Sequence, residues 1–221
     1  MIAVAIDGPA GAGKSTIARR AAKEIGFIYV DTGALYRTIG LFMLEHGIDT
    51  QNEQAVCEQL EHVRVSHTFQ NGEQRVILGD KDVSDKIRTA EVSMAASVVS
   101  AIPKVREYLF DLQKNIAATN NVIMDGRDIG TVVLPDAKIK IFLTASPEER
   151  AKRRCNEMLA KGMKAEYDEV LADIKTRDYN DSHRAIAPLV PAKDAILVDT
   201  TDIDLEQSIA KLTQIIKERL S

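Results

Sequence analysis

A glycine-rich stretch near the start of the chain places the strongest constraint on the fold. Residues 8 to 16 read GPAGAGKST and follow an apolar run, IAVAI at residues 2 to 6, that is typical of a strand buried on both faces. A helix is expected from Lys14 to Glu24, with Gly26 just beyond its C-terminus. The pattern G-x-x-x-x-G-K-[ST] between a strand and a helix indicates a phosphate-binding loop, because the glycines let successive backbone N–H groups point at an anion.

Short apolar runs recur along the chain and predict its fold class. They are FIYVD at residues 27 to 31, NVIMD at 121 to 125, KIKIFLT at 138 to 144 and AILVD at 195 to 199, each separated from the previous one by a helical pattern. This alternation predicts an α/β fold of the P-loop NTPase type, with a five-stranded parallel sheet flanked by helices.

One segment departs from that alternation. Between residues 62 and 85 apolar and polar residues alternate around Asn71-Gly72, a strong hairpin signal, and KDVS can add a third strand. We expect a small antiparallel β insertion there. Residues 88 to 118 then have a helical pattern interrupted at Pro103, which suits the first turn of a new helix.

Length and composition limit the possible functions. With 221 residues, 45% hydrophobic and 28% charged, the chain is sufficient for one domain, and its net charge of −4 gives no general footprint for nucleic acid or membrane binding. Cys57 and Cys155 are far apart in sequence and form no zinc or disulfide pattern. No run of 18 apolar residues occurs, so we expect a cytoplasmic protein.

The phosphate-binding loop points to a nucleotide triphosphate and a metal ion. Lys14 can reach the β and γ phosphates, Ser15 can place its hydroxyl on Mg²⁺, and Thr16 can contact the α phosphate. A GTPase would need a base-reading Asn-Lys-x-Asp loop after a later strand. An oligomeric ATPase would normally have a Walker B strand that ends in Asp-Glu. This chain has neither, and VIMD is followed by Gly-Arg-Asp.

Two further strand ends carry candidate ligands for an acceptor. DTGALYR, residues 31 to 37, and DGRDIGT, residues 125 to 131, should face the same crevice as the phosphate loop, because ligands collect at the carboxyl ends of the strands in such sheets. Arg127 offers a planar fork of donors to a phosphate, and Asp128 can accept hydrogen bonds from an uncharged group. The alternatives are a Thr32 N-cap with a surface Arg37, and a local Asp/Arg ion pair.

Two helical segments add further charged candidates. Arg177, Asp181 and Arg184 have the spacing i, i+4, i+7 and should share one helical face, unless they form ordinary solvated pairs. The segment SPEERAKRR is expected to begin a helix with Ser146 as its N-cap. Its arginines can close over a nucleotide as a mobile lid, and the alternative is that they are ordinary surface residues. These arginines are Arg150, Arg153 and Arg154.

The motif series resembles the bacterial cytidylate kinase family from residue 6 to residue 189. The matching segments, in order, are IDGPAGAGKST, DTGALYR, IPKVRE, DGRDIGTVV, IFLTASPEERAKRR and RDYNDSHRAIAPL. The resemblance implies the nucleoside-monophosphate kinase type of fold in a single domain. It implies a core of residues 1–61 and 99–221, a CMP-binding insertion at about 62–98 and a lid at about 146–166.

The resemblance also implies an activity and a set of site residues. The expected reaction is transfer of the γ-phosphoryl group of ATP to CMP or dCMP, giving ADP and CDP or dCDP in pyrimidine metabolism, with Mg²⁺ as cofactor and the protein as a monomer. ATP would be bound by Gly8, Pro9, Ala10, Gly11, Ala12, Gly13, Lys14, Ser15, Thr16, Arg150, Arg153 and Arg154, with Ser15 on the metal. Lys14, Arg127 and Arg154 would be catalytic. Thr32, Arg37, Arg127 and Arg184 would hold the CMP phosphate, Arg177 and Asp181 the ribose, and Ser97, Arg106 and Asp128 the cytosine.

Two other functions stay open on the sequence alone. The first is a kinase with the same scaffold acting on UMP, AMP or shikimate. The second is a nucleotide-dependent binding module that uses ATP as a switch and transfers nothing, although no basic stripe or exposed heptad pattern favours it.

Overall fold

The computed structural model describes residues 1–70, 73–160 and 162–220. The chain forms two compact units. The first consists of Met1–Ile2 and Ile28–Val122, and the second of Ala3–Phe27 and Ile123–Ser221.

The main sheet confirms the predicted α/β fold. Its five strands are β1 (Ala3–Asp7), β2 (Ile28–Asp31), β6 (Val122–Gly126), β7 (Ile139–Thr144) and β8 (Ile196–Asp199), hydrogen-bonded in the order β2-β6-β1-β7-β8. β1 pairs in parallel with β7, with Val4 opposite Ile139, and β7 pairs in parallel with β8. Val4, Ala5 and Ile6 are fully buried, as expected for a central strand with an uninterrupted apolar sequence.

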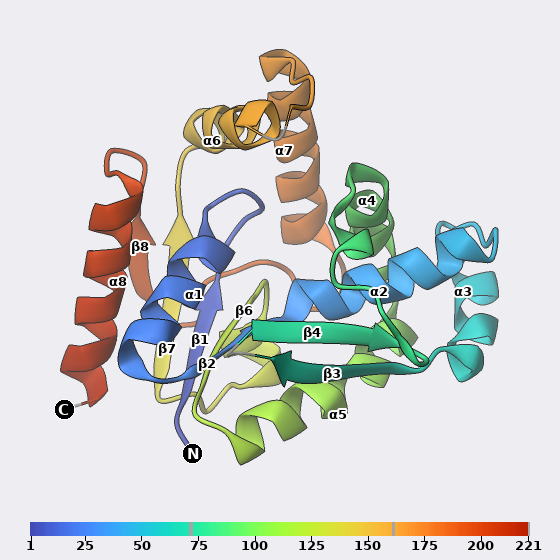
Figure 1. The fold of residues 1–221 in the computed structure, drawn as a ribbon, viewed down its shortest axis with the longest axis horizontal. Helices are drawn as coiled ribbons and strands as arrows, with labels where there is room; N and C mark the ends of the chain where they lie inside the picture. Colours follow the sequence, from blue (N-terminus) through green and yellow to red (C-terminus); the bar gives the residue numbers. More distant parts are fainter. Residues whose placement is uncertain (71–72, 161, 221) are drawn as a thin grey trace. The chain divides into compact units, whose positions relative to one another are not determined.

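Among its described residues, the second unit contains four α-helices. α1 (Lys14–Ile25) begins directly after the glycine-rich loop and ends at Gly26, whose φ of 74° confirms the predicted glycine stop. α8 (Leu205–Leu220) lies beside α1, and α6 (Pro147–Ala160) packs on α7 (Tyr167–His183) (Figure 1). α8 buries Ile209, Leu212 and Ile216, which have the spacing of one helical face.

The first unit is built around α2 (Thr32–Glu45). Its other helices are α3 (Glu53–Gln59), α4 (Ala90–Val99) and α5 (Pro103–Thr119), and the predicted helix start at Pro103 is confirmed. α2 buries Leu35, Ile39 and Met43 in an apolar core. Gly40 allows the close approach of α4, because a Cβ there would lie 3.0 Å from the backbone nitrogen of Ala96.

The predicted antiparallel insertion is confirmed as a separate three-stranded sheet. It contains β3 (Val65–Gln70), β4 (Glu73–Leu78) and β5 (Lys81–Asp82) in that order, with β5 inside the predicted KDVS strand. β3 and β4 pair in antiparallel register from Val65 opposite Leu78 to Gln70 opposite Glu73. The predicted Asn71-Gly72 turn lies outside the described residues.

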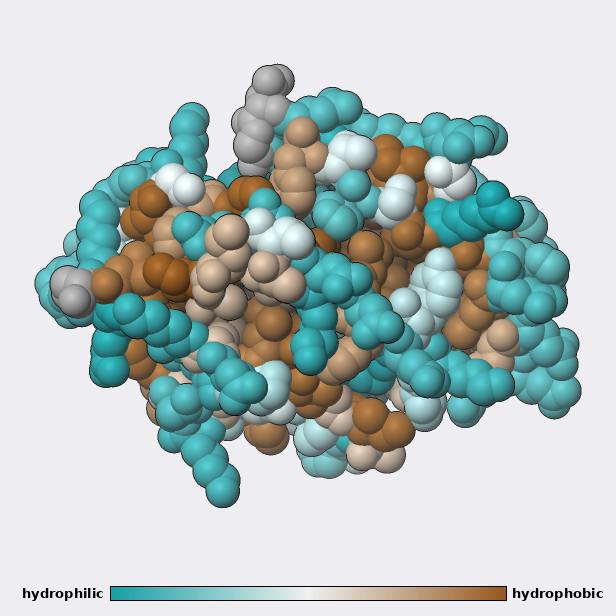
Figure 2. Space-filling model, turned by 90° about the horizontal axis from the view of Figure 1, so that it is seen from below, coloured by the Kyte–Doolittle hydropathy of each residue, from teal (hydrophilic) through white to brown (hydrophobic). Residues whose placement is uncertain are grey.

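One face of the molecule shows the mixed surface of a globular protein. The face drawn in Figure 2 intersperses hydrophilic and hydrophobic side chains, which is ordinary because apolar atoms contribute much of any protein surface. Within residues 1–70, 73–160 and 162–220, every helix is too short or too polar to span a bilayer.

Candidate active site

The glycine-rich loop adopts backbone conformations that depend on its glycines. Gly11 and Gly13 have φ angles of 74° and 81°, in the left-handed region that other residues rarely adopt. Gly8 has a φ of 152°, and a Cβ at this position would lie 1.9 Å from the carbonyl oxygen of Leu143. The loop therefore takes a shape that only these residues permit and leads into the N-terminus of α1, where backbone N–H groups favour an anion.

Lys14 is held inside this loop. Its Nζ donates hydrogen bonds to the carbonyl oxygens of Gly8 and Pro9 at 2.7 and 2.8 Å, and the residue is buried. Burial and then the positive charge of Arg127 lower the pKa of Lys14 to about 7, against the opposite influence of nearby aspartates. Negative charge close to a lysine raises its pKa and so favours the protonated form.

Ser15 and Asp125 form a pair of oxygen ligands suited to a divalent ion. The Ser15 hydroxyl donates to the Asp125 carboxylate at 2.9 Å, and Asp125 is buried near the end of β6. A hydroxyl beside a carboxylate at a phosphate-binding loop is the donor set that Mg²⁺ uses together with substrate phosphates. Only Ser15 was predicted to bind the metal, although the aspartate at the end of VIMD is a sequence signal for Asp125 as a second ligand.

Two arginine–carboxylate pairs connect the segment after β6 with the C-terminal end of α7 and the residue beyond it. Arg127 donates through Nε to Asp181 at 2.7 Å. Burial raises the pKa of Asp181, but the opposing charge and hydrogen bond of Arg127 outweigh it and the pKa is lowered. Arg184 lies 3.4 Å from Asp128, and both side chains are more than nine-tenths buried.

The prediction that Arg177, Asp181 and Arg184 share one helical face is wrong for Arg184. Arg177 and Asp181 lie in α7, but the helix ends at His183, and Arg184 has extended backbone angles of −64° and 140°. Its Nε donates to the carbonyl oxygen of Ala187 at 2.5 Å, which fixes the side chain beyond the helix. Burial and then the charge of Arg127 lower the pKa of Arg177.

In the first unit, Asp31 organises the start of α2. One carboxylate oxygen accepts the backbone N–H of Ala34 at 3.0 Å, and the other accepts from Arg37 at 2.6 Å. The helix is therefore capped by Asp31 and not by Thr32, which is its first residue. Burial raises the pKa of Asp31, but Arg37 and then Arg88 outweigh it, so the pKa is lowered.

Arg37 is a partly buried side chain and not a surface charge. Its side chain is 21% exposed, and its Nε is buried without a hydrogen-bond partner among the described residues. A buried donor of this kind is costly unless a ligand or water satisfies it.

The other two candidates in the first unit lie in α4 and α5. Arg106 is buried, donates to the carbonyl oxygen of Ser100 at 3.2 Å, and lies with its guanidinium 5.8 Å from the ring centre of Tyr36. The carbonyl oxygen of Ser97 accepts from the Ser100 hydroxyl at 2.9 Å. Ser100 therefore contacts both Ser97 and Arg106, the two residues of this unit that are predicted to contact the base.

The three predicted lid arginines have different surroundings. Arg150 is 3% exposed and donates to both carboxylate oxygens of Asp178 and to the carbonyl oxygens of Ala10 and Ala145. It is therefore not an ordinary surface arginine. The predicted Ser146 cap of α6 is confirmed, since its Oγ accepts the backbone N–H of Glu149 at 3.2 Å.

Arg153 and Arg154 make fewer buried contacts than Arg150. Arg153 donates to Glu149 at 3.0 Å and to the Thr200 hydroxyl at 3.1 Å. Arg154 is 41% exposed in its side chain and pairs with Glu157 at 3.4 Å. An ATP-binding role for all three arginines stays a prediction, and Arg154 has the most exposed side chain of the three.

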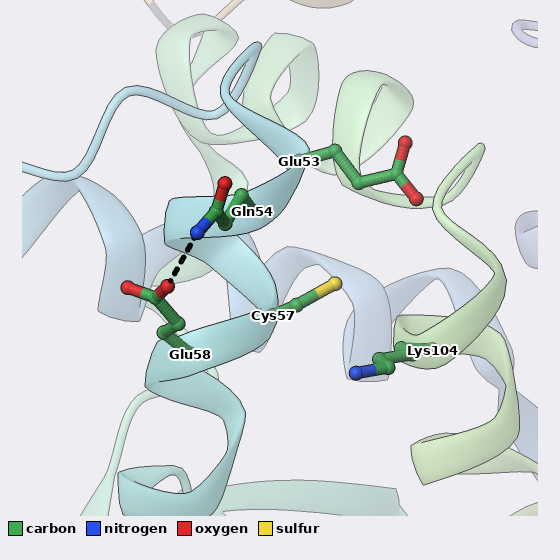
Figure 3. A pocket seen from close by; sticks show the side chains of 5 residues that line it. All are labelled: Glu53, Gln54, Cys57, Glu58 and Lys104. Atoms are coloured by element: carbon green, nitrogen blue, oxygen red, sulfur yellow. Dashed lines mark hydrogen bonds between the residues drawn. The ribbon is translucent and has the colours of Figure 1, made fainter.

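A cavity of about 570 Å³ lies between α3 and the start of α5 (Figure 3). It is lined by Glu53, Gln54, Cys57, Glu58 and Lys104. None of these residues belongs to the phosphate loop or the predicted acceptor set, so the cavity is separate from the chemistry described above.

Comparisons with known proteins show which family the chain resembles in sequence. A family model described as cytidylate kinase matches residues 4–218. A cytidylate kinase from Carboxydothermus hydrogenoformans is 50% identical over 213 residues, covering 96% of each chain. One from Mycobacterium leprae is 49% identical over 219 residues, covering 99% of this chain and 96% of that protein.

Solved structures share the fold at low sequence identity. A shikimate kinase from Bacteroides thetaiotaomicron has a TM-score of 0.50 and 13% identity, with 98% of both chains covered. An uncharacterized protein from Eubacterium ventriosum has a TM-score of 0.54 and 12% identity, covering 98% of this chain and 99% of that one. The similarity in sequence is far more specific than the shared fold, and the chain belongs to the cytidylate kinase family.

Proposed function

We propose that this protein transfers the γ-phosphoryl group of ATP to CMP or dCMP, giving ADP and CDP or dCDP. Membership of the cytidylate kinase family over almost the whole chain is the observation that carries the proposal. Its residues also supply a phosphate-binding loop and several arginines, the two features needed to bring two polyanions together.

On the donor side, the loop from Gly8 to Thr16 binds the ATP phosphates. Its backbone N–H groups and Lys14 neutralise negative charge, and Arg153 and Arg154 are proposed to approach from α6. The Ser15 hydroxyl, with Asp125 at 2.9 Å, would hold Mg²⁺. The ion, when bound, neutralises charge on the ATP phosphates.

On the acceptor side, Arg37, Arg127 and Arg184 bind the CMP phosphate together with Thr32. Each arginine already lies against a carboxylate, at 2.6, 2.7 and 3.4 Å respectively. The carboxylates keep the guanidinium groups in place and partly neutralised until a phosphate dianion offers stronger, bidentate hydrogen bonds. Arg177 and Asp181 bind the ribose.

The chemical step is an in-line displacement. An anionic oxygen of the CMP phosphate forms a bond to the γ-phosphorus, and the bond from that phosphorus to the β,γ-bridging oxygen breaks, releasing ADP. The attacking oxygen carries no proton at neutral pH, so the reaction needs no general base. Lys14, Arg127 and Arg154 contribute by aligning the groups and stabilising charge on the transferred phosphoryl group.

Base selectivity is assigned to Ser97, Arg106 and Asp128. Cytosine has an amino donor at N4 and acceptors at N3 and O2, which complement a carboxylate and a guanidinium. Uracil would place O4 against the Asp128 carboxylate, acceptor to acceptor. Such a mismatch leaves buried polar groups unpaired and can reduce the rate by orders of magnitude.

A panel of coupled assays tests the proposal. ADP release is measured with ATP, Mg²⁺ and each of CMP, dCMP, UMP, AMP and shikimate, and the nucleotide product is identified by chromatography. CMP or dCMP should have the highest kcat/KM. Faster turnover of UMP, or tight binding of ATP and CMP without formation of CDP, would contradict it.

Two variants separate the proposed roles. Lys14→Ala should lower kcat by about 100-fold or more, because it removes charge stabilisation at the reacting phosphates. Asp128→Ala should act mainly on the preference for CMP over UMP. Equal and mild effects of both substitutions would contradict these roles.

Biological context and assembly are part of the same proposal. We expect the reaction to serve pyrimidine nucleotide metabolism in the cytoplasm and the protein to act as a monomer, without nucleic acid or membrane partners. Light scattering of the purified chain tests whether it is a monomer, and fractionation of cells tests whether it is cytoplasmic.

A further inference from the structure

The buried carboxylate of Asp7 connects the donor loop to the segment after β6. Asp7 ends β1 directly before Gly8 and is 4% exposed. Its two oxygens accept the backbone N–H groups of Ile129 and Gly130, both at 2.7 Å. From its sequence position alone, Asp7 is recognisable only as the end of a strand.

These two N–H groups open a short helical turn. Residues Ile129–Val133 form one turn of π-helix, and Asp128 occupies the N-cap position with φ of −148° and ψ of 27°. The first N–H groups of a helical turn have no partner within it and need an acceptor from elsewhere. Aspartate is among the residues that most often supply that acceptor from the N-cap position.

Asp128 nevertheless does not cap its own turn. Its side chain makes no cap hydrogen bond, and its carboxylate lies 3.4 Å from Arg184 instead. Asp7 supplies the missing acceptor from a different strand. Gly130 permits the close approach, because a Cβ on this residue would lie 3.3 Å from a carboxylate oxygen of Asp7.

We propose that Asp7 is a positioning residue for nucleobase selection: it caps the Ile129–Val133 turn in place of Asp128 and so directs the Asp128 carboxylate toward Arg184 and the base. The inference rests on the proposed function, in which Asp128 reads cytosine. One consequence is that the strand leading into the ATP-binding loop also sets the geometry of base recognition on the acceptor side.

The variant Asp7→Asn tests the proposal with little change in shape. Burial, the largest influence, raises the pKa of Asp7 to about 6, so at neutral pH and above the side chain is mainly the carboxylate that can accept both N–H groups. The amide nitrogen of asparagine cannot accept the second N–H, and Asp128 then becomes the nearest replacement cap. We expect the ratio of kcat/KM for CMP to that for UMP to fall by about 10-fold or more, as for other lost polar contacts to a substrate.

The ATP parameters distinguish positioning from general damage. KM for ATP should change by less than about threefold in Asp7→Asn, because the loop backbone is unchanged. The control is Asp199→Asn, since this exposed aspartate at the end of β8 accepts hydrogen bonds from the backbone N–H and the hydroxyl of Thr201, two residues further along. This control should retain the wild-type preference.

A double variant and an exchange measurement complete the test. In the Asp128→Ala background, Asp7→Asn should have no further effect on the CMP to UMP ratio, since both act through one carboxylate. Hydrogen exchange of the segment 127–133 should be faster in Asp7→Asn than in the wild type.

The outcomes separate this proposal from the proposed function. An unchanged CMP to UMP ratio in Asp7→Asn, or unchanged exchange of the segment, overturns the role of Asp7. A wild-type enzyme that does not prefer CMP contradicts the function instead, and exchange of the segment 127–133 still reports whether Asp7 caps the turn.

Discussion

At the scale of single residues, the cationic side chains of the candidate site contact carboxylates or carbonyl oxygens of the protein itself. The arginines predicted to hold the acceptor phosphate each contact an aspartate, and Lys14 contacts two carbonyl oxygens. These contacts orient the cationic groups before any ligand arrives, which reduces the entropy lost on binding. They are also contacts that a phosphate can replace, since it offers more charge and more acceptor atoms.

The lowered pKa of Lys14 predicts that ATP binding takes up a proton. Without ATP the pKa of Lys14 is about 7, below the ordinary lysine value of 10.5, and the ATP phosphates should raise it again. At pH 8 only about a tenth of the lysine is then protonated in the ligand-free protein, so binding should take up roughly 0.9 proton.

Calorimetry in several buffers measures this uptake. The apparent binding enthalpy at pH 8 should vary with the ionisation enthalpy of the buffer, with a slope near one proton. Lys14→Arg is the control, because arginine stays protonated and should give a slope near zero. A slope near zero in the wild type would show that Lys14 is already charged.

At the scale of secondary-structure elements, Arg150 connects α6 to α7 and to the phosphate loop. Its guanidinium donates to Asp178 on α7 and to the carbonyl oxygen of Ala10 in the loop. Arg154, on the same helix, has an exposed i,i+3 contact with Glu157. The two arginines should therefore contribute differently to stability and to turnover.

Alanine substitutions of these two arginines test the difference. Arg150→Ala should lower the free energy of unfolding by roughly 2–4 kcal/mol, because it leaves buried acceptors without a donor. Arg154→Ala should change it by less than about 0.5 kcal/mol, as expected for an exposed pair, yet lower kcat if it contacts the phosphates. Denaturant unfolding and steady-state kinetics give both quantities, and equal losses of stability would contradict the assignment.

The elements were largely predictable, and the partners of the side chains were not. Apolar runs identified the five parallel strands, and Pro103 identified a helix start, because both signals are local. The contact between Asp7 and Gly130 joins residues 123 positions apart and leaves no trace in local sequence. The end of α7 at His183 also lacked a glycine or proline signal, so Arg184 was assigned to the helix.

For the same reason, the sequence predicted which residues belong to the candidate site but not which groups each of them contacts. The motifs identified Arg150 from its position after a strand, but only the fold determines that it is buried against Asp178. Sequence also could not decide whether Asp31 or Thr32 caps α2, since both residue types are good N-caps.

At the scale of the whole molecule, the proposed acceptor residues lie in segments that are far apart along the chain. Thr32, Arg37, Ser97 and Arg106 come before β6, and Arg127, Asp128, Arg177, Asp181 and Arg184 come after it. A ligand that contacts several segments stabilises each of them against local opening, because each opening must first release the ligand.

Hydrogen exchange with bound CMP therefore tests the proposed residue set as a whole. Saturating CMP should slow exchange in residues 31–37 and in residues 177–184 to a similar degree, whereas ATP alone should mainly slow residues 8–16. UMP at the same concentration should have a smaller effect on both acceptor segments, because it binds less tightly. Protection by CMP in only one of the two segments would mean that the other segment does not contact the acceptor, and the residues assigned from that segment would have to be withdrawn.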